Sequence, residues 1–263
     1  MFEDNWHFPN CLGSVDGKHI EIVPPPESRS FYYNYKGFHS IDLMAIANAN
    51  YELLYAHFGT NERISDGGVI EYTGFHNLLT NNLLHLPGIN PTNGLPYVFV
   101  SDEAFALGEN FLKPYSVKML DHDKIVFNYR LSRARRVVEN VFGILVARIG
   151  VLQKKINLSP GNIDIVVMTC CVLHNFLRRH ATSTYTPQSQ LILKMKTLMK
   201  FDMAIGLKEK MLPASQWDTQ EIQLRQQSLS ETSSKPFSIL LKAECYGRKI
   251  TCKSSEVEKR MLE

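Results

Sequence analysis

FNYRLSRARRVVENVFGILVARIGVL, residues 127–152, is the stretch of this chain that decides its fold. Apolar residues recur in it at the three- and four-residue spacing of one helix face, so we predict a helix over 128–147. Such a helix has to bury its apolar stripe against another layer of secondary structure. The positions that carry the stripe are Val137, Val138, Val141, Phe142, Leu145 and Val146.

Strand patterns on the N-terminal side of this helix supply the layer that it needs. We predict one strand over 11–23, with a polar interruption at 16–19. The prolines at 24–26 end it, because proline cannot continue a ladder of backbone hydrogen bonds. The remaining predicted strands are 41–49 and 52–58, joined as a β-hairpin, and a short buried strand over 97–100.

Two further helices are predicted. One begins with Ser65 or Asp66 as its N-cap and carries apolar residues as far as Leu79. The other covers 162–179, and its last residues are cations, which suit the negative end of a helix dipole. The order strand, strand, strand, helix, strand, helix predicts an α/β fold, a mixed sheet flanked by helices.

The character of the chain changes after about residue 185. Residues 180–235 are rich in Ser, Thr and Gln, and their apolar periodicity is weak, although 187–212 shows the pattern of an amphipathic helix. We therefore expect one folded domain over 1–185. Residues 186–263 are expected to form a divergent tail that is partly helical or disordered.

The bulk composition is that of a globular, soluble chain. Hydrophobic residues make up 44% and charged residues 21%, which argues against wholesale disorder. The formal net charge of +3 is too small to indicate a nucleic-acid partner by itself. No apolar signal segment lies in 1–9, and the apolar run at 163–173 is too short to cross a bilayer. Five cysteines without a CxxC pair indicate buried thiols, so we expect an intracellular protein with no membrane contact.

Four acidic residues stand where a sheet and its helices can bring side chains together. Two divalent ions about 3.5–4 Å apart can clamp the attacking and leaving oxygens of a phosphodiester. Carboxylate oxygens are the ligands that Mg²⁺ prefers. Each residue also has a structural interpretation. Asp16 could form a hairpin turn with Gly17, Asp66 could cap a helix, Asp102 could be a turn residue, and Glu139 could pair with Arg135 or Arg136.

The residues around each carboxylate are more specific than the spacing between carboxylates. Six blocks, in the same order over roughly residues 6–180, resemble the motifs of Harbinger (PIF) DDE transposases and the nucleases derived from them. The blocks are GSVDGKHI (13–20), YYNYKGFHSIDLMAIANANYELLYAHFG (32–59), SDGGV (65–69), LPYVFVSDEAFALGENFLKPY (95–115), FNYRLSRARRVVENVFGILVARIGVL (127–152) and CCVLHNFL (170–177).

The resemblance implies an RNase H-like fold over 1–185 and a metal-dependent DNA endonuclease. It implies that Asp16, Asp102 and Glu139 are the catalytic, metal-binding triad, with Asp66 as a fourth metal ligand and Mg²⁺ or Mn²⁺ as the cofactor. Nuclear localisation, with the cytoplasm as a second compartment, is expected on the same ground. Family members normally carry a substantial region before the first aspartate. We therefore expect a piece of a longer protein or a domesticated descendant that lost its flanks.

Basic residues near these carboxylates predict a surface that binds DNA phosphates. The alternative is a solvated helix face with internal ion pairs. No helix-turn-helix or zinc finger is present to read sequence, so a separate DNA-binding partner protein is expected. The candidate DNA-binding residues are Lys18, Lys36, Arg130, Arg133, Arg135, Arg136 and Arg148.

Some residues and function classes stay open at this stage. Tyr32, Tyr33 and Tyr35 either stack on bases or make structural contacts, and we expect structural contacts for at least two of them. His174 is predicted to be a packed, hydrogen-bonded residue. A catalytically inactive descendant that serves as a DNA- or protein-binding module is the main rival function. An unrelated α/β hydrolase has little support, because no GxSxG motif or Gly-rich phosphate loop occurs.

Overall fold

The computed structural model describes residues 2–59, 73–90, 94–105, 108, 110–116 and 121–186, and the backbone of two short strands near the C-terminus. Asp66 and the helix predicted within 187–212 lie outside the described residues. The elements are α1 (Phe2–Trp6), β1 (Cys11–Glu21), β2 (Ser40–Ala47), β3 (Leu53–Phe58), α3 (Gly74–Thr80), β4 (Val98–Val100), β5 (Phe111–Leu112), α4 (His122–Arg148), the 3-10 helix η2 (Gly150–Gln153), α5 (Pro160–His180), α6 (Thr182–Tyr185), β6 (Lys242–Cys245) and β7 (Arg248–Thr251).

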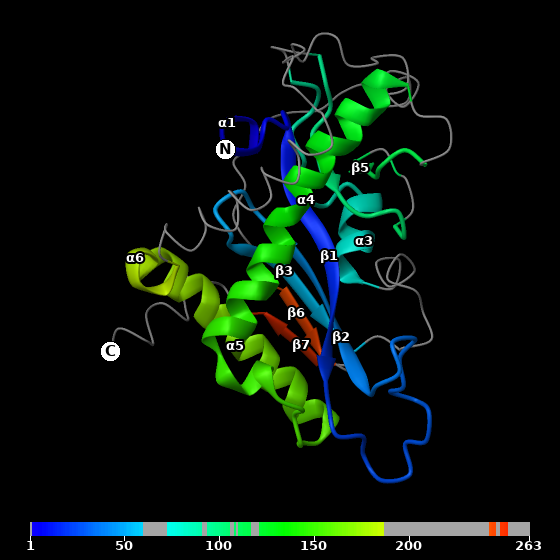
Figure 1. Cartoon of the computed structure of the whole chain (residues 1–263), viewed down its shortest axis with the longest axis vertical. Helices are drawn as coiled ribbons and strands as arrows, with labels where there is room; N and C mark the ends of the chain where they lie inside the picture. Colours follow the sequence, from blue (N-terminus) through cyan, green and yellow to red (C-terminus); the bar gives the residue numbers. More distant parts are fainter. Residues whose placement is uncertain are drawn as a thin grey trace.

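A mixed five-stranded sheet with the order β3-β2-β1-β4-β5 is the centre of the fold. β1 and β3 both pair antiparallel with β2, whereas β4 is parallel to β1 and β5 is parallel to β4. Figure 1 shows the long α4 crossing the sheet next to β1. The predicted α/β class and mixed sheet are therefore confirmed. β5, β6 and β7 were not predicted, and the last two form a separate two-stranded sheet.

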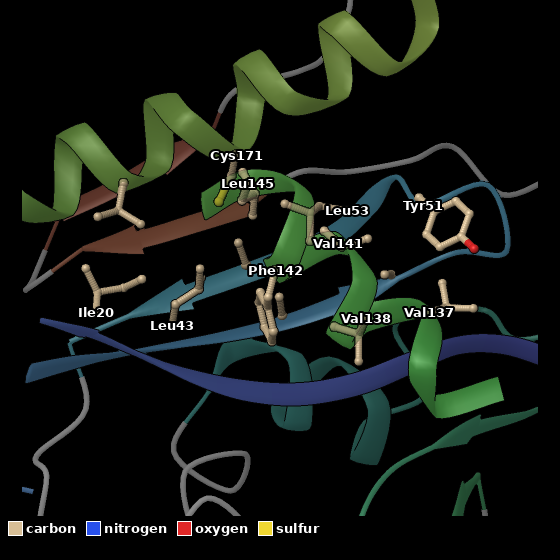
Figure 2. Packing of buried hydrophobic residues seen from close by; sticks show 14 of the residues in the cluster. Ile20, Leu43, Tyr51, Leu53, Val137, Val138, Val141, Phe142, Leu145 and Cys171 are labelled. Atoms are coloured by element: carbon tan, nitrogen blue, oxygen red, sulfur yellow. The ribbon is translucent and has the colours of Figure 1, made fainter. Parts of the chain in front are cut away.

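Both faces of the five-stranded sheet are buried, each in its own apolar cluster. On one face the strands meet the predicted stripe of α4, and Figure 2 shows Val138 and Phe142 of α4 in the same layer of buried side chains as Ile20 and Leu43 of the strands. On the other face Phe75 of α3 packs with residues of the first four strands. This two-sided burial follows from the alternation of side chains along a strand.

Helix ends follow their capping residues more closely than their apolar periodicity. The helix predicted over 128–147 is longer at its start, because the Asp121 side chain accepts the Lys124 backbone N–H at 2.9 Å. The predicted N-cap of α3 is wrong. The described helix begins at Gly74, and Thr73 caps it by accepting the His76 backbone N–H. The helix predicted over 162–179 is confirmed as α5.

β1 runs without a break through the predicted polar interruption at 16–19. Asp16 and Gly17 pair with Ala45 and Met44 of β2, so the hairpin-turn interpretation of Asp16–Gly17 is wrong. A Cβ at Gly13 would lie 2.8 Å from Ile46 Cγ2, so only glycine allows this close approach of β1 and β2. The continuous strand holds Asp16 in a rigid element.

α5 is the second core helix, and by length and composition alone it is apolar enough to cross a membrane. In the structure it packs on β3 and α4 through a buried face. His174 fixes it, with Nε2 2.7 Å from the Tyr51 carbonyl oxygen and Nδ1 2.9 Å from Tyr185 Oη. The prediction for His174 is confirmed. Cys170 and Cys171 are buried free thiols, also as predicted.

Candidate active site

Asp16 and Asp102 come together through the pairing of two parallel strands. Ser14 of β1 lies opposite Val100 of β4, so each aspartate lies two residues beyond this pair on its own chain segment. Residues two apart along a strand point to the same face of the sheet. Ile20 of β1 and Val100 of β4 belong to the cluster on the α4 face, so Asp16 is placed at the side of the sheet that α4 covers, and Asp102 lies just beyond the end of β4.

The same region of β1 fixes α4 and thereby Glu139. The buried Ser14 Oγ accepts the Val138 backbone N–H at 3.0 Å, which ties the middle of α4 to β1. Glu139 is the next residue of the helix, and its side chain is 47% exposed. Because the apolar stripe of α4 faces the sheet, Glu139 lies at the rim of that contact. No sequence signal identified Ser14 in this role.

The Asp16 carboxyl group is largely buried, with 17% of its side chain exposed. Its pKa is raised to about 6, chiefly by burial and also by the charges of Asp102 and Glu139, while a hydrogen bond from the Gly17 N–H at 2.8 Å and the charge of Arg135 act in the lowering direction. Asp102 and Glu139 are therefore both close enough to Asp16 to affect the ionisation of its carboxyl group. A buried carboxyl with a raised pKa and defined charge partners is typical of functional sites.

Arg135 lies between two of these carboxylates. Its Nη2 is 2.9 Å from Glu139 Oε1 and 4.0 Å from Asp16 Oδ2. The interpretation of Glu139 as an ion-pair partner one turn after Arg135 is thus confirmed as a contact. The turn interpretation of Asp102 is confirmed too, because its Oδ1 accepts the Ala104 backbone N–H at 2.9 Å. These contacts coexist with the clustering of the carboxylates.

The donor chemistry of this site fits a hard divalent cation. Carboxylate oxygens are preferred by Mg²⁺ and Mn²⁺, and a cation would relieve the repulsion among the three negative charges. Within the part of the chain that the structure describes, however, no three His, Cys, Asp or Glu side chains are arranged to hold a metal ion. Asp66, the predicted fourth ligand, is outside that part. The residue types therefore suit a metal ion, and the Arg135 guanidinium group lies close to two of these carboxylates.

Two lysines lie near each other beside Asp16, Lys18 on β1 itself and Lys36 in the loop between β1 and β2. Lys18 shares the sheet face of Asp16, two residues away. Burial and the charge of Lys36 lower the pKa of Lys18, and the charge of Asp16 opposes this effect. Lys36 Nζ lies 5.3 Å from the centroid of the Tyr35 ring. An anion placed here would relieve the repulsion between the two lysines.

The predicted arginines of α4 differ in their distance from the carboxylates. Arg136 lies one turn before Glu139, like Arg135. Burial and the charge of Arg133 lower the pKa of Arg130, so these two cations lie near each other in the first half of the helix. Arg148 follows Glu139 by nine residues, which is about 13.5 Å along a helix axis. The structure does not bring Arg148 to the carboxylates.

The aromatic residues of the loop after β1 divide into packed and exposed rings. Tyr32 packs against the core, whereas Tyr33 is 50% and Tyr35 is 76% exposed. The exposed rings still make edge contacts, Tyr33 with His39 and Tyr35 with His19. The predicted structural contacts are therefore present, and two large aromatic surfaces also remain open to solvent.

Comparisons with known proteins agree with the motif resemblance. The sequence model of the family described as "DDE superfamily endonuclease" matches residues 15–175, more than half of the chain. A relative in Xenopus laevis named "Putative nuclease HARBI1" is 24% identical over 175 residues, 65% of this chain and 47% of the relative. The Homo sapiens protein of that name is 22% identical over 181 residues, 68% of this chain and 49% of the relative. The chain thus spans about half the length of these curated relatives. No solved structure matches it.

Proposed function

The chain belongs to the DDE superfamily endonuclease family, and on that premise we propose that it is a metal-dependent DNA endonuclease with Asp16, Asp102 and Glu139 as its catalytic carboxylates. The observation that carries the proposal is geometric: Arg135 lies 4.0 Å from Asp16 and 2.9 Å from Glu139, and the pairing of Ser14 with Val100 brings the end of β4, which Asp102 follows, beside β1. The strand order and directions support an RNase H-like arrangement, with three antiparallel strands followed by two that are parallel to the first.

The proposed roles follow from where each side chain is held. The carboxylates of Asp16, Asp102 and Glu139 would hold Mg²⁺ or Mn²⁺, and Asp66 is proposed as a further ligand. When bound, such an ion polarises a phosphodiester and lowers the pKa of a water molecule. The Gly17 N–H orients the Asp16 carboxylate, and the partial burial of that side chain limits competition from bulk water.

The positive side chains around the carboxylates would bind the DNA backbone. Lys18 and Lys36 lie on the β1 side of the site, and Arg130, Arg133 and Arg136 lie on α4. Their contacts with phosphates give affinity without sequence preference. We therefore propose that a separate DNA-binding partner protein chooses the target sequence. We also propose that the chain acts in the nucleus, as the family resemblance implies.

Plasmid nicking by the purified chain tests this proposal, with Mg²⁺ or Mn²⁺ compared with EDTA. Asp16→Ala should abolish metal-dependent nicking and should leave binding to a fluorescent duplex unchanged or tighter, because it removes a negative charge. Asp123→Asn is the matched control, since it removes a carboxylate from the exposed first turn of α4 and should nick as the wild type does. Nicking that survives Asp16→Ala would overturn the assignment.

One observation favours a second function, that of an inactive DNA-binding module. Arg135 already lies within ion-pair distance of two of the three carboxylates and offsets part of their negative charge from within the chain. The same assay separates the two functions. A folded protein that binds duplex DNA and nicks in neither metal would support the module and would overturn the endonuclease for this chain.

A further inference from the structure

We propose that Arg135 is a placeholder cation, which occupies the carboxylate site in the absence of metal and moves to a DNA phosphate when substrate binds. Metal and DNA would then each favour the binding of the other. This inference rests on the proposed function, because it takes Asp16 and Glu139 as metal ligands. It adds a positioning residue that controls when those ligands become free.

The Arg135 guanidinium group lies between two of the proposed metal ligands. Arg135 Nη2 contacts Glu139 Oε1 and is also within 4.0 Å of Asp16 Oδ2, so it lies where a cation shared by these two residues would lie. A divalent ion that used the same oxygens would meet a positive charge at close range.

The contacts that Arg135 makes in the structure hold it weakly. Its pair with Glu139 is an i,i+4 contact on a helix surface, and the Glu139 side chain is 47% exposed, so water competes for it. The Arg135 Nε is buried and has no hydrogen-bond partner. A buried donor without an acceptor is unfavourable, so the observed pose leaves a free-energy gain available to any ligand that supplies an acceptor.

A DNA phosphate is the ligand that suits these unused donors. Guanidinium groups bind phosphate oxygens through two parallel hydrogen bonds, which a single carboxylate contact does not provide. A phosphodiester that is cut at Asp16 has to approach within reach of Arg135, because the two side chains are neighbours. Lys18, on the same sheet face as Asp16, adds attraction for the same anion.

The thermodynamic consequence is a reciprocal coupling between two ligands. If DNA removes Arg135 from the carboxylates, it raises the affinity for the metal, and the metal must raise the affinity for DNA by the same factor. The nuclease site would then fill with metal mainly on DNA. Removal of the Arg135 charge should reduce the dependence of metal binding on DNA.

Manganese binding without DNA is the direct test, measured by calorimetric titration in slightly alkaline buffer. Arg135→Gln should bind Mn²⁺ at least roughly fivefold more tightly than the wild type, since it removes a competing ion pair of ordinary surface strength. Lys124→Gln is the matched control. It removes one positive charge and one ion pair, that with Asp121, from the same helix at a residue without a role in the proposed site, so it should leave the Mn²⁺ affinity close to that of the wild type.

The outcomes separate this inference from the proposed function. Asp16→Asn should weaken Mn²⁺ binding in the wild-type and Arg135→Gln backgrounds alike. Equal Mn²⁺ affinities in wild type and Arg135→Gln, both dependent on Asp16, would overturn the placeholder role and leave the endonuclease proposal in place. Mn²⁺ binding that is independent of Asp16 in every variant would instead overturn the metal site itself.

A second measurement and a second variant protect the test against misfolding. Mn²⁺ should raise the affinity of the wild type for a short fluorescent duplex by a larger factor than that of Arg135→Gln, and equal factors would contradict the coupling. If circular dichroism shows that Arg135→Gln is unfolded, Arg135→Lys takes its place. Its single ammonium group cannot make the same fork of contacts, so Mn²⁺ binding tighter than in the wild type is expected, and unchanged binding overturns the proposal.

Discussion

Replacement of Asp16 by Asn should stabilise the fold at neutral pH and should have no such effect in acid. The Asp16 carboxyl has a pKa of about 6 in the folded protein, chiefly because of burial, compared with an ordinary value of 3.8. Asparagine has nearly the same shape, carries no charge and keeps an oxygen that accepts the Gly17 N–H. The substitution therefore removes the charge of Asp16 with little change in packing.

The sign of the effect follows from proton linkage. Below pH 3.8 the carboxyl is protonated in both states, and Asp16 does not weaken the fold. Between 3.8 and about 6 the unfolded chain is ionised while the folded protein still holds the proton, so stability falls as pH rises. Above about pH 6 the carboxyl is ionised in both states, and the loss of folding stability caused by Asp16 is complete. The interval between the two values corresponds to about 3 kcal/mol in the free energy of unfolding.

Urea denaturation in EDTA measures this difference at a series of pH values from acid to slightly alkaline. The gain of Asp16→Asn over the wild type should be near zero in acid and should rise toward about 3 kcal/mol above the upper pKa. Asp123→Asn, at an exposed carboxylate, is the control and should show no such pH-dependent gain. A gain that is constant across the series, or largest in acid, would refute the reasoning, because neither result can come from the titration of Asp16.

Three further predictions concern the frame around the site. Leu145→Ala should lower the free energy of unfolding by about 2–5 kcal/mol in urea denaturation, because this side chain is 1% exposed and packs against the sheet, and a smaller loss would mean that the core refills the cavity. Ser14→Ala should cost about 1–3 kcal/mol in the same assay by removing the buried acceptor of the Val138 N–H, and a neutral result would show that this contact does not hold α4. Lys18→Gln with Lys36→Gln should weaken duplex binding and reduce the salt slope by about 2, and an unchanged slope would exclude these lysines from phosphate contact.

The regular elements were predictable from the sequence because their burial is periodic. The stripe from Val137 to Leu145 marks the buried half of α4, and the start of the helix depends instead on the capping residue Asp121. β1 was harder to predict. Its polar middle resembles a break in the local sequence, but every residue from Ser14 to Glu21 pairs with β2, so the strand continues. Such long-range pairing overrides local preference and leaves no local signal.

The candidate site was predictable in its residue types and only partly in its geometry. The motif resemblance selects Asp16, Asp102 and Glu139, whereas the register that aligns the two aspartates is a property of the parallel pairing of β1 and β4. The spacing of Arg135 and Glu139 predicted their ion pair. It could not predict that the same guanidinium also approaches Asp16, because that contact depends on how α4 is rotated on the sheet.

A single structural cause explains why the charge of Asp16 destabilises the fold and why Arg135 lies beside it. Glu139 can share a site with Asp16 only if α4 lies close to β1, and the buried Ser14–Val138 hydrogen bond keeps it there. The same closeness removes water from Asp16 and makes its negative charge unfavourable. A cation is therefore needed near the carboxylates whether or not metal is bound. Arg135 lowers the pKa of Asp16 and supplies that charge from within the chain. The Arg135–Glu139 ion pair is partly exposed to water and is therefore weak, so a divalent ion can displace Arg135 from the carboxylates.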